Sequence, residues 1–349
     1  MHTQRDVIAD AFEVFIGYAL KGAQGQFFTP RNVVKLMVKA IDPKPGELVI
    51  DPACGSGGFL IESLKYLWDK IDEQGKKLSW NEHTIEVEKN KLASGCINGI
   101  EKDKFLCKVA KAYMTILGDG ESGIFCEDSL NVPSEWHMDT TQKIQLGKFD
   151  VLLTNPPFGK EIKVIGKEKL SQYDLSYKWK KVNDKFEKTT DLKDKMNPEV
   201  LFVERSLQLL KDGGRMGIIL PETFFFAPKS KYVMDFIVRN NNITWIIDIP
   251  HNTFRPHNNA KCIVIIFEKN RPQQDFINMA IAEEIGHNHQ GKELYRWDYE
   301  KQAVNKDLLW DDVPLIINEM DSSFHHYCFR QDYSTVEKKE YICSSLLLE

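Results

Sequence analysis

Long apolar runs are absent from this 349-residue sequence. No window approaches the roughly 18 uninterrupted apolar residues that a membrane-spanning helix needs. The first six residues do not lead into the apolar region of a signal peptide either. The sequence therefore predicts a soluble, cytoplasmic protein with no membrane partner.

Paired cysteines and metal-binding histidine motifs are also lacking. The seven cysteines are scattered and odd in number, with no Cys-x-x-Cys pair, and the nine histidines include no His-Glu-x-x-His motif. A disulfide framework or a zinc site needs closer, paired spacing. We therefore predict reduced thiols and no metal site.

An excess of positive charge is the third absence, because the formal net charge is −5. Phosphate neutralisation dominates the affinity of tight DNA-binding proteins, so an acidic chain is not expected to bind DNA tightly by itself. A local basic patch or a basic partner subunit can supply that attraction. The apolar share of 42% is enough for a packed globular core.

Apolar strand patterns and helical patterns alternate along the middle of the chain. Strands are predicted at residues 48–50, 97–100, 124–126, 149–154, 217–220, 243–247 and 262–267, and helices from 57, over 103–117, over 199–211 and near 229–240. This alternation is typical of a mainly parallel sheet covered by helices on both faces. The last two strands are joined by a loop without a helical pattern, so they can pair antiparallel.

Other segments flank or interrupt this pattern. An amphipathic helix is predicted over residues 6–21, and a second helix begins with Thr29 as N-cap and Pro30 at its first position. Gly213 and Gly214 are expected to end the helix before them. The polar stretch 70–95 and the lysine-rich stretch 159–197 are interpreted as surface insertions, and the seven acidic residues among the lysines of 160–195 favour a solvated flexible loop over a phosphate-binding one.

A glycine-rich turn joins the first predicted strand to its helix. The segment runs Asp51-Pro-Ala-Cys-Gly-Ser-Gly-Gly-Phe, so the strand ends in an acid and glycines follow. Glycines there let the backbone lie against a ligand beyond the carboxyl ends of the strands. The segment is neither the Gly-x-Gly-x-x-Gly dinucleotide pattern nor a P-loop. The acid suits a ligand that carries a positive charge, such as the ammonium of a methionine moiety.

Two later strands also end in acids. Glu101 is placed to accept hydrogen bonds from ribose hydroxyls, and Asp128 from the amino group of a cofactor adenine. Taken alone, either acid is more simply explained as a solvated carboxylate at the end of a strand. Three acids at three successive strand ends, Asp51 included, favour a pocket.

Asn155-Pro156-Pro157-Phe158 follows the strongest predicted strand. The prolines lack backbone donors and stiffen the turn. The Asn155 side-chain oxygen and the Pro156 carbonyl can each accept an N–H bond of an aromatic amine, which localises the amine's lone pair toward a methyl donor. Phe158 can stack on the base. The tetrapeptide alone is explained equally well as an ordinary Asn-Pro turn. The glycine turn that precedes it in the same predicted sheet favours the catalytic interpretation.

Together with Gly25-Gln-Phe-Phe-Thr-Pro30, these motifs resemble the amino-methyltransferases that act on adenine in DNA, and more narrowly the modification subunits of type I restriction–modification systems. The resemblance runs from about residue 6 to about residue 300. It implies an S-adenosylmethionine-dependent methyltransferase (Rossmann-like) α/β fold, with a seven-stranded mainly parallel sheet whose last strand is antiparallel. Family members usually have a helical domain before this segment and often continue after it, so we expect a fragment, a short paralogue or part of a split gene.

The resemblance also implies a division of the chain and a set of site residues. The expected parts are an N-terminal helical segment (1–24), a catalytic domain (25–270) and a C-terminal extension (271–349). Phe158 and Phe226 would stack on the flipped base, although Phe224 and Phe225 compete with Phe226. The residues expected at the cofactor are Phe28, Thr29, Asp51, Ala53, Gly55, Ser56, Gly57, Gly58, Glu101, Asp128 and Asn155.

The function implied is methyl transfer from S-adenosylmethionine to the exocyclic amino group of an adenine extruded from double-stranded DNA. The implied partners are a specificity subunit and a restriction subunit. Two alternatives stay open at this point. One is methylation of a protein glutamine or an RNA base, which the same motif serves, and the other is a non-catalytic assembly module that retains the fold.

Overall fold

The computed structural model describes residues 29–117, 123–158, 162–183, 185–256, 258–298 and 302–320. The helix predicted over 6–21 and the cofactor contact predicted for Phe28 lie outside these residues. Within them, eight strands form one central sheet in the order β12-β10-β11-β9-β4-β1-β2-β3. Their bounds are β1 Val49–Asp51, β2 Ile97–Ile100, β3 Ile124–Phe125, β4 Phe149–Thr154, β9 Leu210–Pro221, β10 Asn242–Asp248, β11 Cys262–Glu268 and β12 Asn278–Ile281.

The sheet is mainly parallel, as the sequence predicted. β11 runs antiparallel to both of its neighbours, β9 and β10, which confirms the pairing expected for the last two predicted strands. Seven strands match the implied fold, and β12 adds an eighth by pairing parallel to β10. This eighth strand comes from the segment assigned to the C-terminal extension, so that segment contributes to the sheet.

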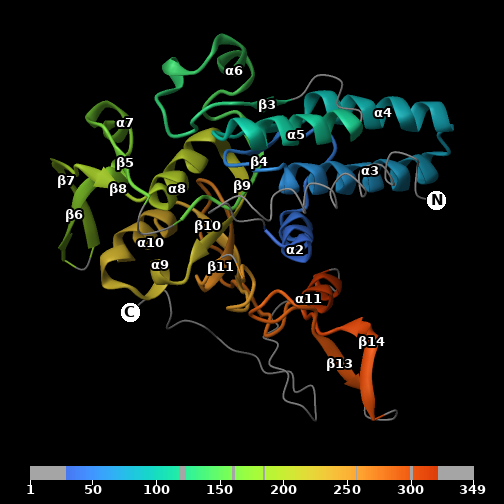
Figure 1. Ribbon diagram of the computed structural model, residues 1–349. Coiled ribbons are helices and arrows are strands. Elements are labelled where there is room, and N and C mark those ends of the chain that lie inside the picture. Colours follow the sequence, from blue (N-terminus) through green and yellow to red (C-terminus); the bar gives the residue numbers. More distant parts are fainter. Residues whose placement is uncertain are drawn as a thin grey trace.

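Helices cover both faces of the sheet (Figure 1). On one face, α2, α3 and α5 pack in an apolar cluster with Val49 and Val151. On the other, α8 and α10 pack with Ile50 and Leu152, because successive strand residues point to opposite faces. The helix bounds are α2 Arg31–Ile41, α3 Gly58–Leu78, α4 Glu82–Gly95, α5 Lys104–Leu117, α6 Met138–Lys143, α8 Pro198–Leu209, α9 Thr223–Phe226, α10 Lys231–Val238 and α11 Val313–Glu319.

Residues 70–95 are helical except for the short connection at residues 79–81, and they are not a separate surface insertion. They form the end of α3 and all of α4, which pack against each other. Ile71, Leu92 and Ala93 are buried in the core. The segment has a polar composition because these helices show one narrow apolar face to the core and the rest to solvent.

The stretch 159–197 is folded where it is described, in contrast to the flexible loop expected from its lysines. It contains β5 Val164–Ile165, α7 Lys167–Ser171, β6 Tyr177–Val182, β7 Lys185–Leu192 and β8 Lys195–Met196. The strands form two small antiparallel sheets, and Leu170, Tyr173 and Leu175 are fully or almost fully buried. Figure 1 shows this insertion beside α8. A few buried apolar residues without periodicity anchor it, which is why the pattern did not predict it.

Two helix boundaries differ from those predicted. α2 begins at Arg31 with Pro30 in the N-cap position, and no side chain caps it. α8 ends at Leu209, before Gly213 and Gly214, which lie inside the long strand β9. The register of β9 against β4 shifts there, so the glycines accommodate an irregularity of the strand.

Beyond β12 the chain forms a small hairpin of β13 Tyr295–Asp298 and β14 Ala303–Leu309. Figure 1 shows this hairpin projecting beside α11 and away from the central sheet. α11 packs on α2. The side chain of Asn32 on α2 donates a 2.8 Å hydrogen bond to Asp311, which ties this C-terminal part to the start of the core.

Candidate active site

The glycine turn and the Asn-Pro-Pro-Phe turn emerge at one edge of the sheet. β1 and β4 are parallel neighbours, with Ile50 opposite Leu152. The carboxyl ends of parallel neighbours point the same way, so the turns after Asp51 and after Thr154 begin side by side. The loop predicted to hold the cofactor and the loop predicted to hold the amine therefore begin at the same edge of the sheet.

The glycine turn after β1 is held by backbone and carboxylate contacts. The amide of Cys54 donates to the carbonyl of Ile100 at 3.0 Å, and Gly57 caps α3 with a φ of 93°. Gly55 has a φ of 55°, and a Cβ added there would meet no atom of the described residues within 4 Å. A backbone conformation that favours glycine, facing open space, is the form expected of a ligand cradle. Ala53, Ser56 and Gly58 belong to the same turn and helix start.

Asp51 is an acid without a cationic partner in the described structure. It is 1% exposed, and its Oδ1 accepts the Ala53 amide at 2.9 Å. Burial raises the pKa of Asp51 to about 7, although the Ala53 amide opposes the shift. A positively charged group placed beside this carboxylate would offset its cost of burial.

Glu101 links the end of β2 to the glycine turn. Its Oε2 accepts the Gly55 amide at 2.8 Å and its Oε1 accepts the Asp103 amide at 2.7 Å. Burial nevertheless raises the pKa of Glu101 above its usual range. A carboxylate offers about four lone-pair positions, so Glu101 can still accept a hydroxyl hydrogen bond beside its backbone amides, as the predicted role requires.

Asp128, which follows β3, is held by two lysines. Lys102 and Lys169 both donate to its Oδ2, at 3.0 and 2.9 Å, and the Leu130 amide donates to Oδ1 at 3.0 Å. Burial alone would raise the pKa of Asp128, but the two lysine hydrogen bonds outweigh it and lower the pKa. Asp128 is therefore an anion with fixed geometry.

The side chain of Asn155 is oriented by Thr29. Nδ2 of Asn155 donates to Oγ1 of Thr29 at 3.0 Å, whereas the buried Oδ1 of Asn155 has no hydrogen-bond partner among the described residues. A buried acceptor that lacks a partner costs about 1–3 kcal/mol. Such an atom is commonly reserved for a ligand or substrate. The Thr29 side chain, predicted as a helix cap, instead serves this amide.

The rest of the tetrapeptide is rigid and largely packed. Pro156 is buried, Pro157 is exposed and Phe158 is 5% exposed. The Phe158 ring packs edge-on against Phe254, with ring centroids 6.1 Å apart. In this conformation the ring serves the core, and stacking on a base would require its neighbours to move.

The three consecutive phenylalanines of α9 occupy different environments. Phe224 is 4% exposed, Phe225 packs partly against the core, and Phe226 is 58% exposed. α9 follows β9, whose Ile218 pairs with Thr154 at the end of β4, so it lies at the same edge as the Asn-Pro-Pro-Phe turn. Exposure therefore singles out Phe226 as the ring available to a partner.

Sequence reasoning missed several neighbours of the predicted residues. Lys102 follows Glu101 directly in the chain, so its proximity could have been noticed. Lys169 and Phe254 are distant in sequence from Asp128 and Phe158, and no pattern signals either contact. Among the described residues there is no group of three or more metal-ligating side chains. None of the described helices is both long and apolar enough to span a membrane.

The strand order, the glycine turn after β1 and the polar turn after β4 define the class as the fold of S-adenosylmethionine-dependent methyltransferases. A Listeria monocytogenes methyltransferase of that class has this fold, with a TM-score of 0.53 over 79% of this chain and 18% identity. The chain itself matches the N-6 DNA Methylase family over residues 3–344. It belongs to that family, which confirms the resemblance drawn from the motifs.

Individual relatives agree with the family. The EcoEI methylase subunit of an Escherichia coli type I restriction enzyme is 26% identical over 278 residues, which cover 78% of this chain and 48% of that protein. A modification subunit ascribed to a Vibrio vulnificus YJ016 type I restriction enzyme has a TM-score of 0.62, with 22% identity, over 93% of this chain and 60% of the other. A chain from a type I restriction–modification complex has a TM-score of 0.56 and 25% identity, over 80% and 50%. The present chain thus spans about half the length of the EcoEI methylase subunit.

Proposed function

We propose that this chain is the catalytic part of a DNA adenine methyltransferase, which transfers a methyl group from S-adenosylmethionine to the exocyclic amino group of adenine. The observation that carries the proposal is the Oδ1 atom of Asn155, which is buried and lacks a partner within the described part of the chain, while Thr29 accepts from Nδ2. An amide fixed in this orientation presents an acceptor, and an acceptor is what an amine donor requires.

The residues fit the cofactor in chemistry and position. The Gly55 backbone would lie against its methionine end, with Thr29, Ala53, Ser56, Gly57 and Gly58 around it. Asp51 would face its positive charge, Glu101 its ribose and Asp128 its adenine. When bound, the cofactor supplies the electrophilic methyl group. The chain's own residues would then orient the amine and accept its two N–H hydrogen bonds.

The substrate base must leave the duplex before it can reach this edge of the sheet. Asn155 and the Pro156 carbonyl would each accept one N–H bond of the amine, which directs its lone pair away from the ring. The exposed Phe226 ring would stack on the extruded base, and Phe158 would contribute once its neighbours move. Membership of a DNA methylase family favours adenine in DNA over glutamine or RNA.

The catalytic test is transfer of labelled methyl groups to unmethylated plasmid DNA, with RNA and protein as competing acceptors. We expect Asn155→Ala to lower the rate about 10²–10³-fold, the usual loss for a preorganised polar group. Its dissociation constant for S-adenosylhomocysteine should stay within about twofold of wild type, since Asn155 acts on the amine. Normal methylation by Asn155→Ala, or labelling of RNA or protein but not DNA, would contradict the proposal.

We further propose that the chain works as a modification subunit with a specificity and a restriction subunit on double-stranded DNA. The relatives named as methylase subunits support this, as does the acidic net charge of the chain. The assay should therefore contain the cognate specificity subunit. Sequencing of methylated positions in the host should show one recognition sequence. Methylation of that sequence should be lost when either this chain or the specificity subunit is deleted. Sequence-specific methylation by the chain alone would argue against this assembly.

A further inference from the structure

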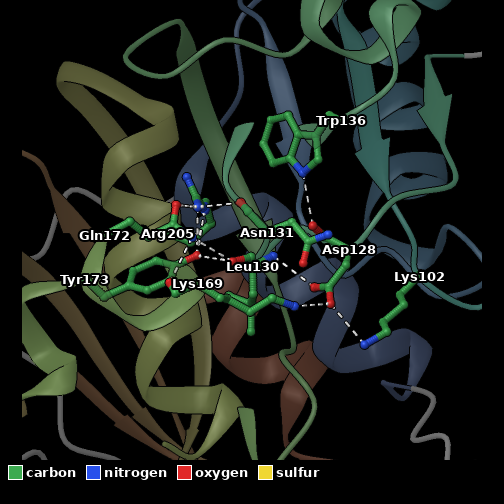
Figure 2. A network of polar contacts seen from close by, with 9 residues as sticks. All are labelled: Lys102, Asp128, Leu130, Asn131, Trp136, Lys169, Gln172, Tyr173 and Arg205. Atoms are coloured by element: carbon green, nitrogen blue, oxygen red, sulfur yellow. Dashed lines mark hydrogen bonds and ion pairs between the residues drawn. The ribbon is translucent and has the colours of Figure 1, made fainter. Parts of the chain in front are cut away.

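The loop that follows β3 is bound at Asp128 and at Leu130 by the 162–197 insertion, which is far from it in sequence. Figure 2 shows this network around Asp128. Nζ of Lys169, on α7, reaches Oδ2 of Asp128 at 2.9 Å. The Gln172 amide and the Tyr173 hydroxyl both donate to the Leu130 carbonyl at 2.9 Å. The insertion thus contacts the carboxylate and the backbone of one short loop.

A buried arginine in α8 anchors the other side of these contacts. Arg205 is fully buried, and its Nε donates to the Tyr173 hydroxyl at 3.0 Å. One of its terminal nitrogens donates to the Asn131 carbonyl at 2.9 Å. Its guanidinium lies over the rings of Trp136 and Tyr173, at 5.7 and 5.1 Å from their centroids. The insertion and the loop are therefore joined to the core as one rigid unit, and Lys169 is carried by it.

The two ion pairs that Asp128 makes with lysines differ in strength because the lysine side chains differ in exposure. They donate to the same oxygen at nearly equal distances, but the side chain of Lys169 is 25% exposed and that of Lys102 is 76% exposed. Exposed ion pairs contribute little because water and salt screen them. Lys169 is the partner that fixes the Asp128 carboxylate.

The Asp128 carboxylate has one hydrogen-bonding position left. A carboxylate offers about four lone-pair positions. The two lysines and the Leu130 amide use three of them. The remaining position, on Oδ1, can accept a single N–H bond, which matches the exocyclic amino group of a cofactor adenine.

We infer that Lys169 is a positioning residue for the adenine end of the cofactor, and that the 162–197 insertion is thereby part of the cofactor site. The inference rests on the proposed function, in which Asp128 accepts the adenine amino group. Lys169 holds Asp128 ionised and oriented, so the strength of that single hydrogen bond depends on a residue outside the shared methyltransferase core.

Calorimetric titration with two ligands tests this. S-adenosylhomocysteine carries the exocyclic amino group of adenine. Its inosine analogue has a carbonyl oxygen at that position. Wild type should prefer the adenosine ligand. In Lys169→Met the dissociation constant for this ligand should rise about 10-fold, whereas that for the inosine analogue should be unchanged. Lys102→Met is the matched control, and it should change the dissociation constants for both ligands less than twofold. Lys169→Arg should bind both ligands like wild type.

The outcomes separate the two levels of the argument. Equal weakening of both ligands in Lys169→Met would indicate a general structural effect and overturn the inference, as would wild-type affinity in that variant. Either result leaves the proposed function intact if wild type binds S-adenosylhomocysteine and methylates DNA. Wild type that binds neither ligand, with or without its partner subunit, would overturn the proposed function and this inference with it.

Discussion

The side chains of Thr29 and Asn155 are joined by a 3.0 Å hydrogen bond from Nδ2 to Oγ1. The bond connects the segment before α2 to the turn after β4, across more than a third of the sequence. In this arrangement Nδ2 is occupied, and Oδ1 is the amide atom that remains able to accept a hydrogen bond. If the amide rotated, it would present a donor to the incoming amine, and two donors do not bind each other.

Removal of the Thr29 hydroxyl should impair turnover more than cofactor binding. We expect Thr29→Val, which is nearly isosteric, to lower kcat about 10-fold, or roughly 1.4 kcal/mol in activation free energy. Thr29→Ser keeps the hydroxyl and should restore most of the rate. Steady-state kinetics of all three proteins would measure this. An unchanged kcat in Thr29→Val would show that Asn155 is oriented by other contacts.

Gly55 and Gly46 form a matched pair for the glycine turn. Both have positive φ angles, of 55° and 91°, and in neither case would an added Cβ meet an atom of the described structure within 4 Å. A side chain costs each turn about 1 kcal/mol or more in backbone strain. Only Gly55 lies at the predicted cofactor, so Gly55→Asp should abolish binding of S-adenosylhomocysteine while Gly46→Asp retains it. Calorimetry and thermal melting compare them, and equal binding by both would exclude Gly55 from the site.

Cofactor affinity should fall as the pH falls through about 7. The folded pKa of Asp51 is raised to about 7, so the carboxylate is lost below that pH. A ligand with a positive charge beside it then loses its partner, at up to tenfold in affinity per pH unit. Titrations between pH 6 and 8 should show this slope, and Asp51→Asn should flatten it. A slope that persists in Asp51→Asn would assign the titration to another group.

The free energy of unfolding of the cofactor-free protein should change with pH in the opposite direction, increasing as the pH falls. An acid whose pKa is raised in the folded state destabilises the protein, and this cost is complete above the folded pKa. The cost shrinks as the pH falls from about 7, the folded pKa, toward about 4, the unfolded pKa. Asp51 and Glu204 both have a pKa of about 7 because of burial. Glu204→Gln should therefore weaken the pH dependence of unfolding by denaturant without altering that of cofactor binding.

Phe226 should act on DNA and not on the cofactor. Stacking of a base on an aromatic ring contributes roughly 1–3 kcal/mol. Phe226→Ala is therefore expected to raise the KM for DNA about 10-fold, whereas Phe226→Tyr retains the ring and the affinity. The exposed ring contributes little to packing, so the melting temperature should change little. Wild-type KM in Phe226→Ala would return the stacking role to Phe158 or its neighbours.

The sequence predicted most of the sheet because its strands are continuous apolar runs. β4 and β11 are examples, and their ends placed Asn155 and the antiparallel pair correctly. It failed for α4 and for the 162–197 insertion, where few buried residues sit among many charges. β12 was missed as well, since four residues carry too little pattern to separate a strand from a loop.

The sequence by itself predicted the chemistry that we propose for this protein. A glycine turn after one strand and Asn-Pro-Pro-Phe after another are local signals, since backbone freedom and side-chain type are fixed by the residues themselves. Only the tertiary structure decided which groups meet across the chain: Thr29 with Asn155, Lys169 with Asp128, and Phe226 left exposed. Such contacts depend on how strands order in the sheet and how insertions dock on it, and no short-range pattern records that.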